Sequence, residues 1–473
     1  MLSAASSHAP RWIFWGVLAI IALAPLPLGS NRPLPSALLL VATGLLLVAW
    51  SAYAAHAKGA ITLRKSQLLQ LTAPALLYGL VLVWIFLQWM PLAGMVHSWA
   101  DPLWEEAARA IAMPLRPSVS INPAATLDGA LRLMAYAGLF WLTLHLARDP
   151  TRAAQARAAI IIVGAATSLY GLFAFFGGQD WLLGNIGARP ADSLTSSFVN
   201  RNSFATFAGL TLLAAVSLFL ERIRHLLALE RPFRRKLVLV IEHMVFQSGL
   251  LTGAVLTIAL ALFLTTSRGG IFASLFALGA LVLLQLPGRG GSQKRSIGFV
   301  VLVVLGIAIV AGGGNFLDRL ERQGLSFETN LRSTLFATTI DAIRTAPLTG
   351  TGFGTYGQAI EAYRVSDENI FAIWEKAHNT YLENALELGL PAAIALNLAI
   401  FLLARRAFLG VRARKRHKSF PALGVASTLL VGLHALVDFS LQIPAVAVLY
   451  AFIMGLALAQ SSLGGRSASS TET

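Results

Sequence analysis

The sequence predicts an all-α, polytopic integral membrane protein with about twelve transmembrane helices and one large helical loop on the external side. Of its 473 residues, 56% are hydrophobic and only 12% are charged, and the mean hydropathy is +0.68. A soluble globular protein carries about 25% charged residues, so this composition excludes an ordinary soluble enzyme. Apolar runs of about 18 residues or more recur along the whole chain, which is typical of membrane-spanning helices.

Twelve apolar segments account for most of the chain. Each is long enough to cross a hydrocarbon core of about 30 Å at about 1.5 Å per residue. The segments lie at residues 12–29, 34–54, 69–90, 125–147, 158–176, 203–220, 245–265, 270–287, 297–313, 386–404, 420–437 and 442–460. The first follows Arg11 as in a signal peptide, but Pro25 and Pro27 interrupt it and no clear A-x-A site follows, so we expect a retained helix.

Turn residues and polar stretches mark the boundaries between these segments. The first six are separated by polar stretches, and the fourth carries Asp128 and Arg132, four positions apart on one helical face. Only the turn at residues 267–270 separates the seventh segment from the eighth. The ninth ends where a long polar stretch begins, and a short turn at residues 440–443 separates the last two.

The basic residues predict the orientation. The chain contains 37 Lys and Arg against 22 Asp and Glu, which gives a formal net charge of +15. With the N-terminus in the cytoplasm, 24 of the basic residues lie in cytoplasmic segments, 12 lie in external ones, and Arg132 lies within a segment. The positive-inside rule therefore favours an N-in, C-in topology. It explains the positive excess without a nucleic-acid partner, and membrane lipids surround the basic runs instead.

This layout divides the chain into four regions. Residues 1–196 hold the first five transmembrane helices, and residues 197–314 hold the next four with external arginine motifs. Residues 315–384 form the large external loop, and residues 385–473 hold the last three helices and a cytoplasmic tail. A polar loop of this length in a chain of spans is typical of a functional segment. Within it we expect helices at about residues 331–345 and 370–388, the second ending at Gly389.

The external cations are almost all arginines. Of the twelve, eleven are Arg and one is Lys376. Arginine binds phosphate oxygens through a planar fork and stays charged when it is partly buried. Arg201 and Arg268 lie at segment ends, where an arginine can also simply reach toward the membrane surface. Because Gly269 and Gly270 follow Arg268, we expect this turn to let a ligand approach closely.

His378 is the candidate general base in the external loop. If residues 370–388 form one helix, Glu375 lies one turn before His378 and can orient its imidazole. From spacing alone, a surface or helix-capping role remains the commoner alternative. Two ionisable pairs at helical spacing, His434 with Asp438 and Asp128 with Arg132, are open to both a functional and a structural interpretation.

The sequence gives no support to several other kinds of site. No cysteine is present, which excludes a disulfide framework and a thiol nucleophile. No H-E-x-x-H motif or tight carboxylate cluster occurs, so we expect neither a metal nor another cofactor. The segment Gly350-Thr-Gly-Phe-Gly354 lacks the G-K-[S/T] of a P-loop, so we expect no nucleotide site, although its amides could receive a phosphate or turn the chain.

Four motifs resemble those of the O-antigen ligase and polymerase superfamily of bacterial envelopes. Ser197-Phe-Val-Asn-Arg-Asn-Ser-Phe204 resembles the family's external N-x-N-x-F segment, and Thr265-Thr-Ser-Arg-Gly-Gly270 resembles its Ser-Arg-Gly turn. Arg332, followed by Asp341-Ala-Ile and Pro347-Leu-Thr-Gly-Thr-Gly-Phe-Gly354, resembles the opening of its large periplasmic loop. His378-Asn379, with Gly389 beyond it, resembles the motif that closes this loop.

The resemblance implies a GT-C-like glycosyltransferase in the bacterial inner (cytoplasmic) membrane, with its active site facing the periplasm. It implies metal-independent, inverting transfer of a glycan from undecaprenyl diphosphate to an acceptor hydroxyl. The acceptor is a lipid A–core sugar in ligases, another lipid-linked glycan in polymerases, and a protein side chain in O-linked protein oligosaccharyltransferases. We favour the ligase and keep the polymerase and the protein transferase as alternatives.

The same resemblance implies roles for individual residues. His378 would be catalytic, and the diphosphate would be bound by Arg268, Arg332 and Arg201. The implied supporting residues are Asn200, Asn202, Glu375 and Asn379. The chemistry agrees with these roles, because transfer needs a base for the incoming hydroxyl. It also needs positive charge on the departing diphosphate, which arginines can supply.

Two other functional classes remain open. A transporter or flippase would also carry about twelve spans, but it should show paired halves and charges near the midplane, whereas here the charges gather in one external loop. A purely structural membrane protein would not need Arg268, Arg332 and His378 together.

Overall fold

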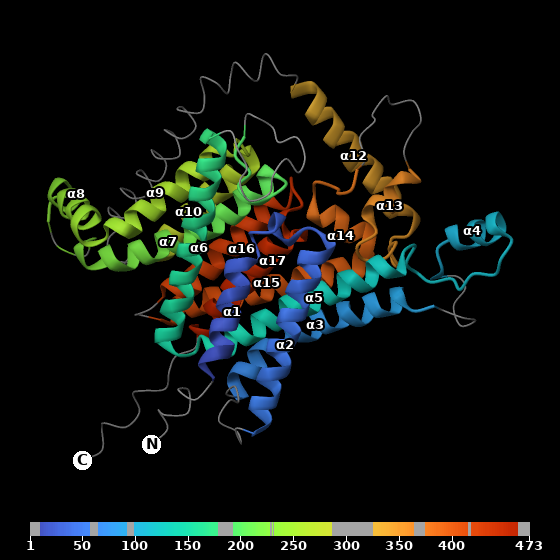
Figure 1. Ribbon diagram of the computed structural model, residues 1–473, viewed down its shortest axis with the longest axis horizontal. Helices are drawn as coiled ribbons and strands as arrows, with labels where there is room; N and C mark the ends of the chain where they lie inside the picture. Colours follow the sequence, from blue (N-terminus) through green and yellow to red (C-terminus); the bar gives the residue numbers. More distant parts are fainter. Residues whose placement is uncertain are drawn as a thin grey trace.

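The computed structural model describes residues 10–56, 65–91, 99–177, 193–227, 229, 231–285, 325–363, 374–414 and 418–461 (Figure 1). No strand occurs within these ranges. The helices are α1 (Arg11–Leu23), η1 (Leu28–Ser30), α2 (Pro33–His56), α3 (Lys65–Trp89), α4 (Leu103–Ile111), α5 (Pro123–Leu146), α6 (Pro150–Gly177), α7 (Arg201–Leu227), α8 (Phe233–Glu242), η3 (His243–Gln247), α9 (Gly249–Leu264), α10 (Arg268–Gln285), α12 (Leu325–Thr345), α13 (Tyr356–Glu361), α14 (Thr380–Leu388), α15 (Leu390–Ala413), α16 (Ser419–His434), η4 (Ser440–Gln442) and α17 (Pro444–Ala459).

Helix α17 lies at the centre of the helix bundle. Of its 16 residues, 15 are buried, and it packs against α5, α7, α15 and α16. A helix that is apolar on every side needs apolar surroundings on every side, which explains its central position. Helix α7 is also enclosed, because 78% of the residues in its most apolar stretch are buried.

The outer helices expose apolar side chains instead of polar ones. On α2, Leu45 and Val48 are 65% and 68% exposed, and Phe173 of α6 is 71% exposed. Leu250, at the start of α9, is 96% exposed. Apolar surface of this extent on the outside of a helix bundle fits surrounding lipid rather than water.

Within the described ranges, six helices are long and apolar enough to cross a membrane, or seven if one bent pair is a single span. They support a multi-pass membrane protein, as predicted. Eleven of the twelve predicted segments coincide with a helix, and the ninth, residues 297–313, lies outside the described residues. The total of twelve spans stays a prediction.

The predicted seventh segment, residues 245–265, begins too early. The π-helical turn η3 follows α8, and the chain bends by 98° between Arg234–Gln247 and Gly249–Leu264. Ser248 leaves the helical region at this point, with φ at −134°. Sharp bends of this kind are typical of π-helical turns, so the regular helix starts only at Gly249.

The predicted external loop contains one helix that differs from its prediction. Helix α12 includes the predicted residues 331–345 and ends before Pro347, as expected. The predicted helix at 370–388 begins only at Thr380, because the Asn379 side chain caps α14 by accepting from two backbone N–H groups. Residues 374–379 are not helical, and residues 364–373 lie outside the described ranges.

Two further boundaries shift near the last spans. The predicted segment 386–404 divides at Gly389, whose φ of +75° separates α14 from α15. The predicted segment 420–437 ends at His434, and residues 435–443 form a connecting loop that includes η4. The turn between the last two spans is therefore longer than the four residues expected.

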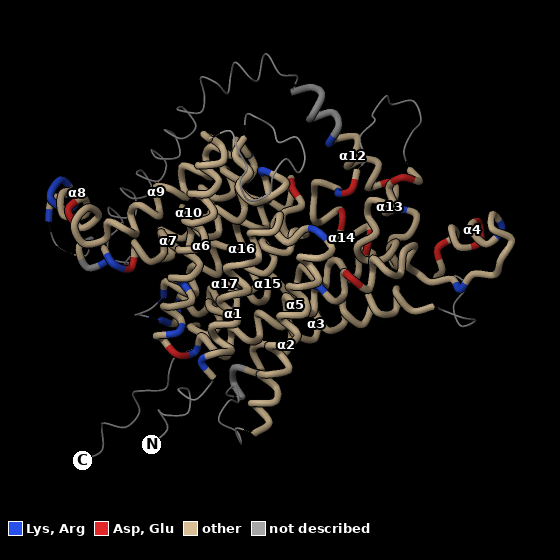
Figure 2. The backbone as a smooth tube through the Cα atoms, in the orientation of Figure 1, with Lys and Arg blue, Asp and Glu red and all other residues tan. Residues whose placement is uncertain are grey.

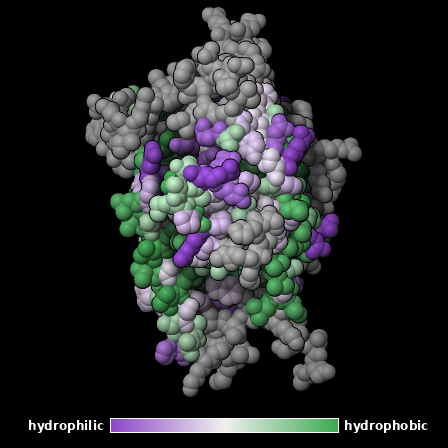
Figure 3. Space-filling view, turned by 90° about the vertical axis from the view of Figure 1, so that its right-hand side faces the viewer, coloured by the Kyte–Doolittle hydropathy of each residue, from purple (hydrophilic) through white to green (hydrophobic). Residues whose placement is uncertain are grey.

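Charged residues gather toward the ends of the bundle. In Figure 2, Lys and Arg are concentrated around α8 and the adjoining left-hand end, whereas Asp and Glu are more frequent near α12, α13, α14 and α4. Seen from the right-hand side in Figure 3, hydrophilic side chains gather in the upper middle of the surface between hydrophobic flanks. A polar region thus lies at the end of the bundle that carries α12, α13 and α14.

Candidate active site

The segment that carries His378 is attached to the loop between α16 and α17. Next to His378, Asn379 donates from Nδ2 to Leu436 O at 3.0 Å. The backbone N–H of Thr380 donates to Ala435 O at 2.9 Å. Loop 435–443 therefore holds the start of α14 from outside the predicted external loop.

His378 has an unusual backbone conformation. Its φ is +51°, in the left-handed region that few non-glycine residues adopt. Its ring packs edge-on against the ring of Phe439, with centroids 4.9 Å apart. Strained backbone of this type is typical of functional sites, where surrounding contacts enforce it.

The Asn200-Arg201-Asn202 motif forms the start of α7. Asn200 Oδ1 accepts from the backbone N–H of Asn202 at 2.7 Å, as a helix-capping side chain does. Arg201 Nη1 donates to Thr266 Oγ1 at 3.2 Å. Arg201 therefore reaches the turn that contains Arg268, which follows Thr266 by two residues.

Asn202 links this turn to loop 435–443. Its Nδ2 donates to Asp438 Oδ1 at 3.0 Å, and its Oδ1 accepts from Ser267 Oγ at 2.7 Å. Asp438 is fully buried and also accepts from the hydroxyl of Ser440. The first two motifs thus meet the loop that holds the His378 segment.

Arg268 is exposed at the first position of α10. The glycines after it do not leave room for a ligand, which corrects our expectation. A Cβ at Gly269 would lie 3.1 Å from the His434 ring, and one at Gly270 would lie 2.6 Å from Ala205 Cβ. These glycines allow α10 to pack closely against α16 and α7.

Arg332 lies on the inner face of α12. It precedes by one helical turn Leu335, whose side chain is 3% exposed. Its guanidinium is near enough to act electrostatically on His434, the residue that packs on Gly269. Arg332 is thereby placed toward the turn that carries Arg268.

The two ionisable pairs have different outcomes. Asp128 and Arg132 form the expected ion pair at 2.7 Å on α5. His434 and Asp438 do not share a helical face, because α16 ends at His434. His434 Nδ1 instead lies 2.6 Å from Thr206 Oγ1.

Glu375 is not where the helical spacing predicted. It is exposed, and residues 374–379 are not helical, so the argument that it lies one turn before His378 is wrong. A Cβ at Gly357 would lie 3.3 Å from its Cα, so its backbone packs against α13. Of the other seven predicted site residues, six lie at the starts of α7, α10 and α14, and Arg332, in the first half of α12, lies near His434 at the end of α16.

The Gly350–Gly354 turn is joined to α14. Thr351 N–H donates to Leu386 O at 2.9 Å, and Gly352 N–H donates to Glu387 O at 3.0 Å. Phe353 N–H donates to the buried Gln88 side chain at 3.3 Å. Because these amides already donate to protein groups, they are not free to bind a phosphate. Of the two roles that the sequence allowed, the turn therefore has the structural one.

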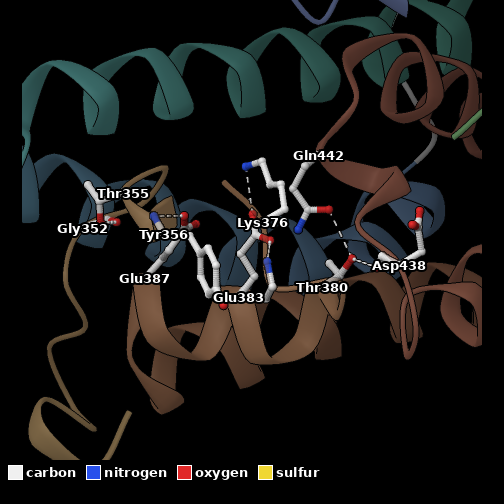
Figure 4. Close-up of polar contacts among 10 residues, drawn as sticks. Gly352, Thr355, Tyr356, Lys376, Thr380, Glu383, Glu387, Asp438 and Gln442 are labelled. Carbon is white, nitrogen blue, oxygen red and sulfur yellow. Dashed lines mark hydrogen bonds and ion pairs between the residues drawn. The ribbon is translucent and has the colours of Figure 1, made fainter. Parts of the chain in front are cut away.

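A group of buried charges on α14 was not predicted from the sequence (Figure 4). Lys376 Nζ donates to Glu383 Oε1 at 2.9 Å, and Glu383 is fully buried. One turn later, Glu387 Oε1 accepts from Tyr356 N–H at 2.9 Å. Lys376 and Glu383 are seven positions apart across a non-helical segment, so no periodic pattern indicates their contact.

Burial raises the pKa of Glu387 to about 7, and the neighbouring Glu383 carboxylate adds to the effect. Folded Glu387 therefore keeps a proton that the unfolded chain loses near the ordinary carboxyl pKa. Its contribution to stability is complete below that ordinary pKa and is lost as pH rises through about 7.

We expect Glu387→Gln to flatten this pH dependence, because glutamine keeps the acceptor for Tyr356 N–H but does not titrate. The melting temperature of the detergent-solubilised variant should fall less than that of the wild type between about pH 5 and pH 7.5. Glu361→Gln, an exposed change in the same loop, is the control and should follow the wild type. Parallel curves for Glu387→Gln and the wild type would contradict the assignment.

A cavity of about 600 Å³ lies between α3, α5, α15 and α17. On α5 its lining runs from Ala125 to Trp141, which corresponds to about 24 Å along the helix. Most lining residues are apolar. The polar lining residues gather toward the end of the cavity that adjoins α14. They are Asp128, Arg132, Lys376, Thr380, Glu383, Asn384, Glu387 and Gln442.

The cavity shares a wall with the region around Arg201, Arg268 and Arg332, here called the arginine region. Thr380 Oγ1 lies 3.2 Å from Gln442 Oε1, which lines the cavity, and 3.1 Å from Asp438 O, on the arginine side. Within the described ranges, no group of three or more His, Cys, Asp or Glu side chains is arranged to hold a metal ion.

The comparisons with known proteins agree with the motifs. Residues 253–397 match the family model described as O-antigen ligase (Wzy_C), whereas no curated protein matches the chain. The matched segment runs from α9 into α15 and includes Arg268, Arg332 and His378. Residues 253–397 are therefore similar to the O-antigen ligase family, in agreement with the motifs in and beside this segment.

Proposed function

We propose that the protein is an O-antigen ligase-like glycosyltransferase. It transfers a glycan from undecaprenyl diphosphate to a hydroxyl of the lipid A–core, on the periplasmic face of the bacterial inner membrane. The proposal is supported by one observation above all. Three of the four motifs, up to about 190 residues apart, meet around loop 435–443, and Arg332 of the remaining motif lies near His434, directly before that loop.

In this mechanism His378 accepts the proton of the acceptor hydroxyl, while Arg201, Arg268 and Arg332 hold the leaving diphosphate. The attacking oxygen forms the new glycosidic bond as the bond to the diphosphate breaks, so the anomeric configuration inverts. Positive charge placed in advance on the departing oxygens lowers the barrier without reorganisation during the reaction. Asn200, Asn202 and Asn379 hold the segments that carry these groups.

Transfer by the purified full chain tests the function directly. A lipid-linked glycan donor is offered with lipid A–core, with a second donor molecule, or with a pilin-like protein as acceptor. Glycan on lipid A–core supports the ligase, and a lengthened donor supports the polymerase. Glycosylated protein supports the O-linked protein oligosaccharyltransferase. No transfer in any mixture, with donor binding intact, would overturn the proposal.

The proposed orientation places the loop around α12, α13 and α14 outside. The cysteine-free chain makes a clean test possible. We expect Glu361→Cys to react with an impermeant thiol reagent from the periplasmic side and Arg412→Cys from the cytoplasmic side. The parent chain controls for background labelling. Reaction of both cysteines from the same side would contradict the N-in, C-in topology.

We also propose that the cavity between α3, α5, α15 and α17 takes the hydrocarbon chain of a lipid substrate. Its length along α5 and its apolar lining fit an extended chain, and its charged end fits a polar head group. An apolar cavity with a few polar groups at one end is typical of a ligand site.

Gly79→Phe should obstruct this cavity. Gly79 lines it, and a Cβ there would have no heavy atom within 4 Å, so the ring can project into open space. We expect the apparent KM for a lipid substrate to rise about tenfold, as when two methylene groups at about 0.8 kcal/mol each are excluded. Gly44→Phe on α2 is the matched control, since Gly44 is equally open but does not line the cavity. Equal KM values for the two variants would remove the cavity from substrate binding.

A further inference from the structure

We propose that Glu383 is a positioning residue for His378, acting through the backbone N–H of Ala377. This inference rests on the proposed role of His378 and deepens it. It assigns a function to the buried ion pair that neither the motifs nor the family match explains.

The contact that carries the inference is local and direct. Glu383 Oε2 accepts from Ala377 N–H at 3.1 Å, and Ala377 directly precedes His378. Glu383 and Ala377 are both fully buried, so no water competes for this hydrogen bond. The carboxylate therefore fixes the chain on the N-terminal side of His378.

The backbone of His378 requires such a restraint. A non-glycine residue in the left-handed region costs about 1–3 kcal/mol and persists only where its surroundings enforce it. On the C-terminal side, Asn379 supplies the restraint by capping α14 and donating to Leu436 O. Glu383 supplies it on the other side, so His378 is held between two anchors on the same helix.

Lys376 keeps Glu383 in the form that this role needs. Its ammonium donates to Glu383 Oε1 at 2.9 Å, leaving Oε2 for the Ala377 amide. Both carboxylate oxygens are therefore engaged, which makes Glu383 unsuited to act as the general base itself. Lys376 also lines the cavity, so the segment that positions His378 forms part of the cavity wall.

Two variants separate positioning from simple stability. Glu383→Leu removes the acceptor, and we expect kcat to fall about 10²-fold, as for a catalytic group displaced by about 1 Å. Affinity for the lipid-linked donor should fall much less than kcat, because the proposed arginine ligands are untouched. The double variant Lys376→Met/Glu383→Gln keeps an amide oxygen for Ala377 N–H without burying an unpaired charge. We expect it to recover kcat to within about tenfold of the wild type.

The pH profile separates positioning of the imidazole from an electrostatic effect of Glu383 on its titration. The acid limb of the rate should lie at the same pH in the double variant and the wild type, because Glu383 acts on the position of the imidazole and not on its titration. Asp341→Asn/Arg344→Gln removes an exposed ion pair of the same loop and should leave kcat unchanged.

Three results would overturn the inference. They are wild-type kcat in Glu383→Leu, a folded but inactive double variant, or loss of donor affinity in Glu383→Leu equal to its loss of kcat. If Glu383→Leu fails to fold, the double variant alone decides, by recovering or not recovering kcat. A wild-type protein that transfers no glycan would instead count against the proposed function, and so the two failures are distinguishable.

Discussion

Arg268→Lys and Arg332→Lys should each reduce glycan transfer about 10²-fold, the effect of losing one preorganised donor to a developing anion. Lysine keeps the positive charge, but it lacks the planar fork that binds two phosphate oxygens at once. Arg268 is exposed at the start of α10, and Arg332 lies near the His434 that packs against the same turn. Both substitutions therefore leave the packing of the bundle intact and change the ligand geometry alone.

The measurement is kcat/KM with purified protein and a donor linked to undecaprenyl diphosphate, together with donor affinity. Arg344→Lys is the matched control, because Arg344 forms an exposed ion pair with Asp341 on the same helix as Arg332. Activity close to wild type in either lysine variant would remove that arginine from the diphosphate site. Inactivation by EDTA that a divalent metal reverses would assign the leaving-group charge to a metal instead.

The parts of the fold that follow from local spacing could be predicted. Hydropathy places eleven apolar segments on helices, and the Asp128–Arg132 and Asp341–Arg344 ion pairs form at helical spacing. Such spacing brings side chains together only where the helix continues between them. His434 and Asp438 have the same spacing but do not share a face, because α16 ends at His434.

The His378 segment shows where the same argument fails. Helical spacing places Glu375 beside His378, but the Asn379 side chain caps α14, which begins at Thr380, two residues after His378. Asparagine is a strong N-cap residue, so this signal was present in the sequence. Residues 370–378 before it are equally compatible with the first turns of a helix, so helical spacing alone does not locate the start of α14.

Other features depend on contacts that no local pattern encodes. The Gly269-Gly270 pair is equally compatible with ligand approach and with close packing, and the choice is made by His434, far away in the sequence. The Lys376–Glu383 pair joins the non-helical residues 374–379 to helix α14. Asp438 reaches Asn202 across 236 positions. Such partners are set by tertiary packing, so a single sequence cannot identify them.

His378→Ala should reduce transfer by about 10²–10⁴-fold, which is the usual contribution of a general base. Its position supports this role, because the arginine region and the cavity meet at the wall beside it, formed by Thr380, Asp438 and Gln442. Donor affinity should remain near the wild-type value, because the diphosphate ligands are arginines on other helices. Protein yield and melting temperature serve as controls for folding.

The pH dependence and a second substitution identify the chemical role of His378. A protonated imidazole cannot accept a proton, so the wild-type rate should fall at acid pH, in the range where an imidazole titrates, about pH 6.5 when unperturbed. The residual activity of His378→Ala should lack this limb. His378→Gln keeps a hydrogen-bond donor but no base, so it should be as impaired as the alanine variant. If His378→Gln instead retained substantial activity, and His378→Ala weakened donor binding, His378 would be a hydrogen-bond donor to the diphosphate. The proton acceptor would then have to be sought among the acidic groups that line the cavity.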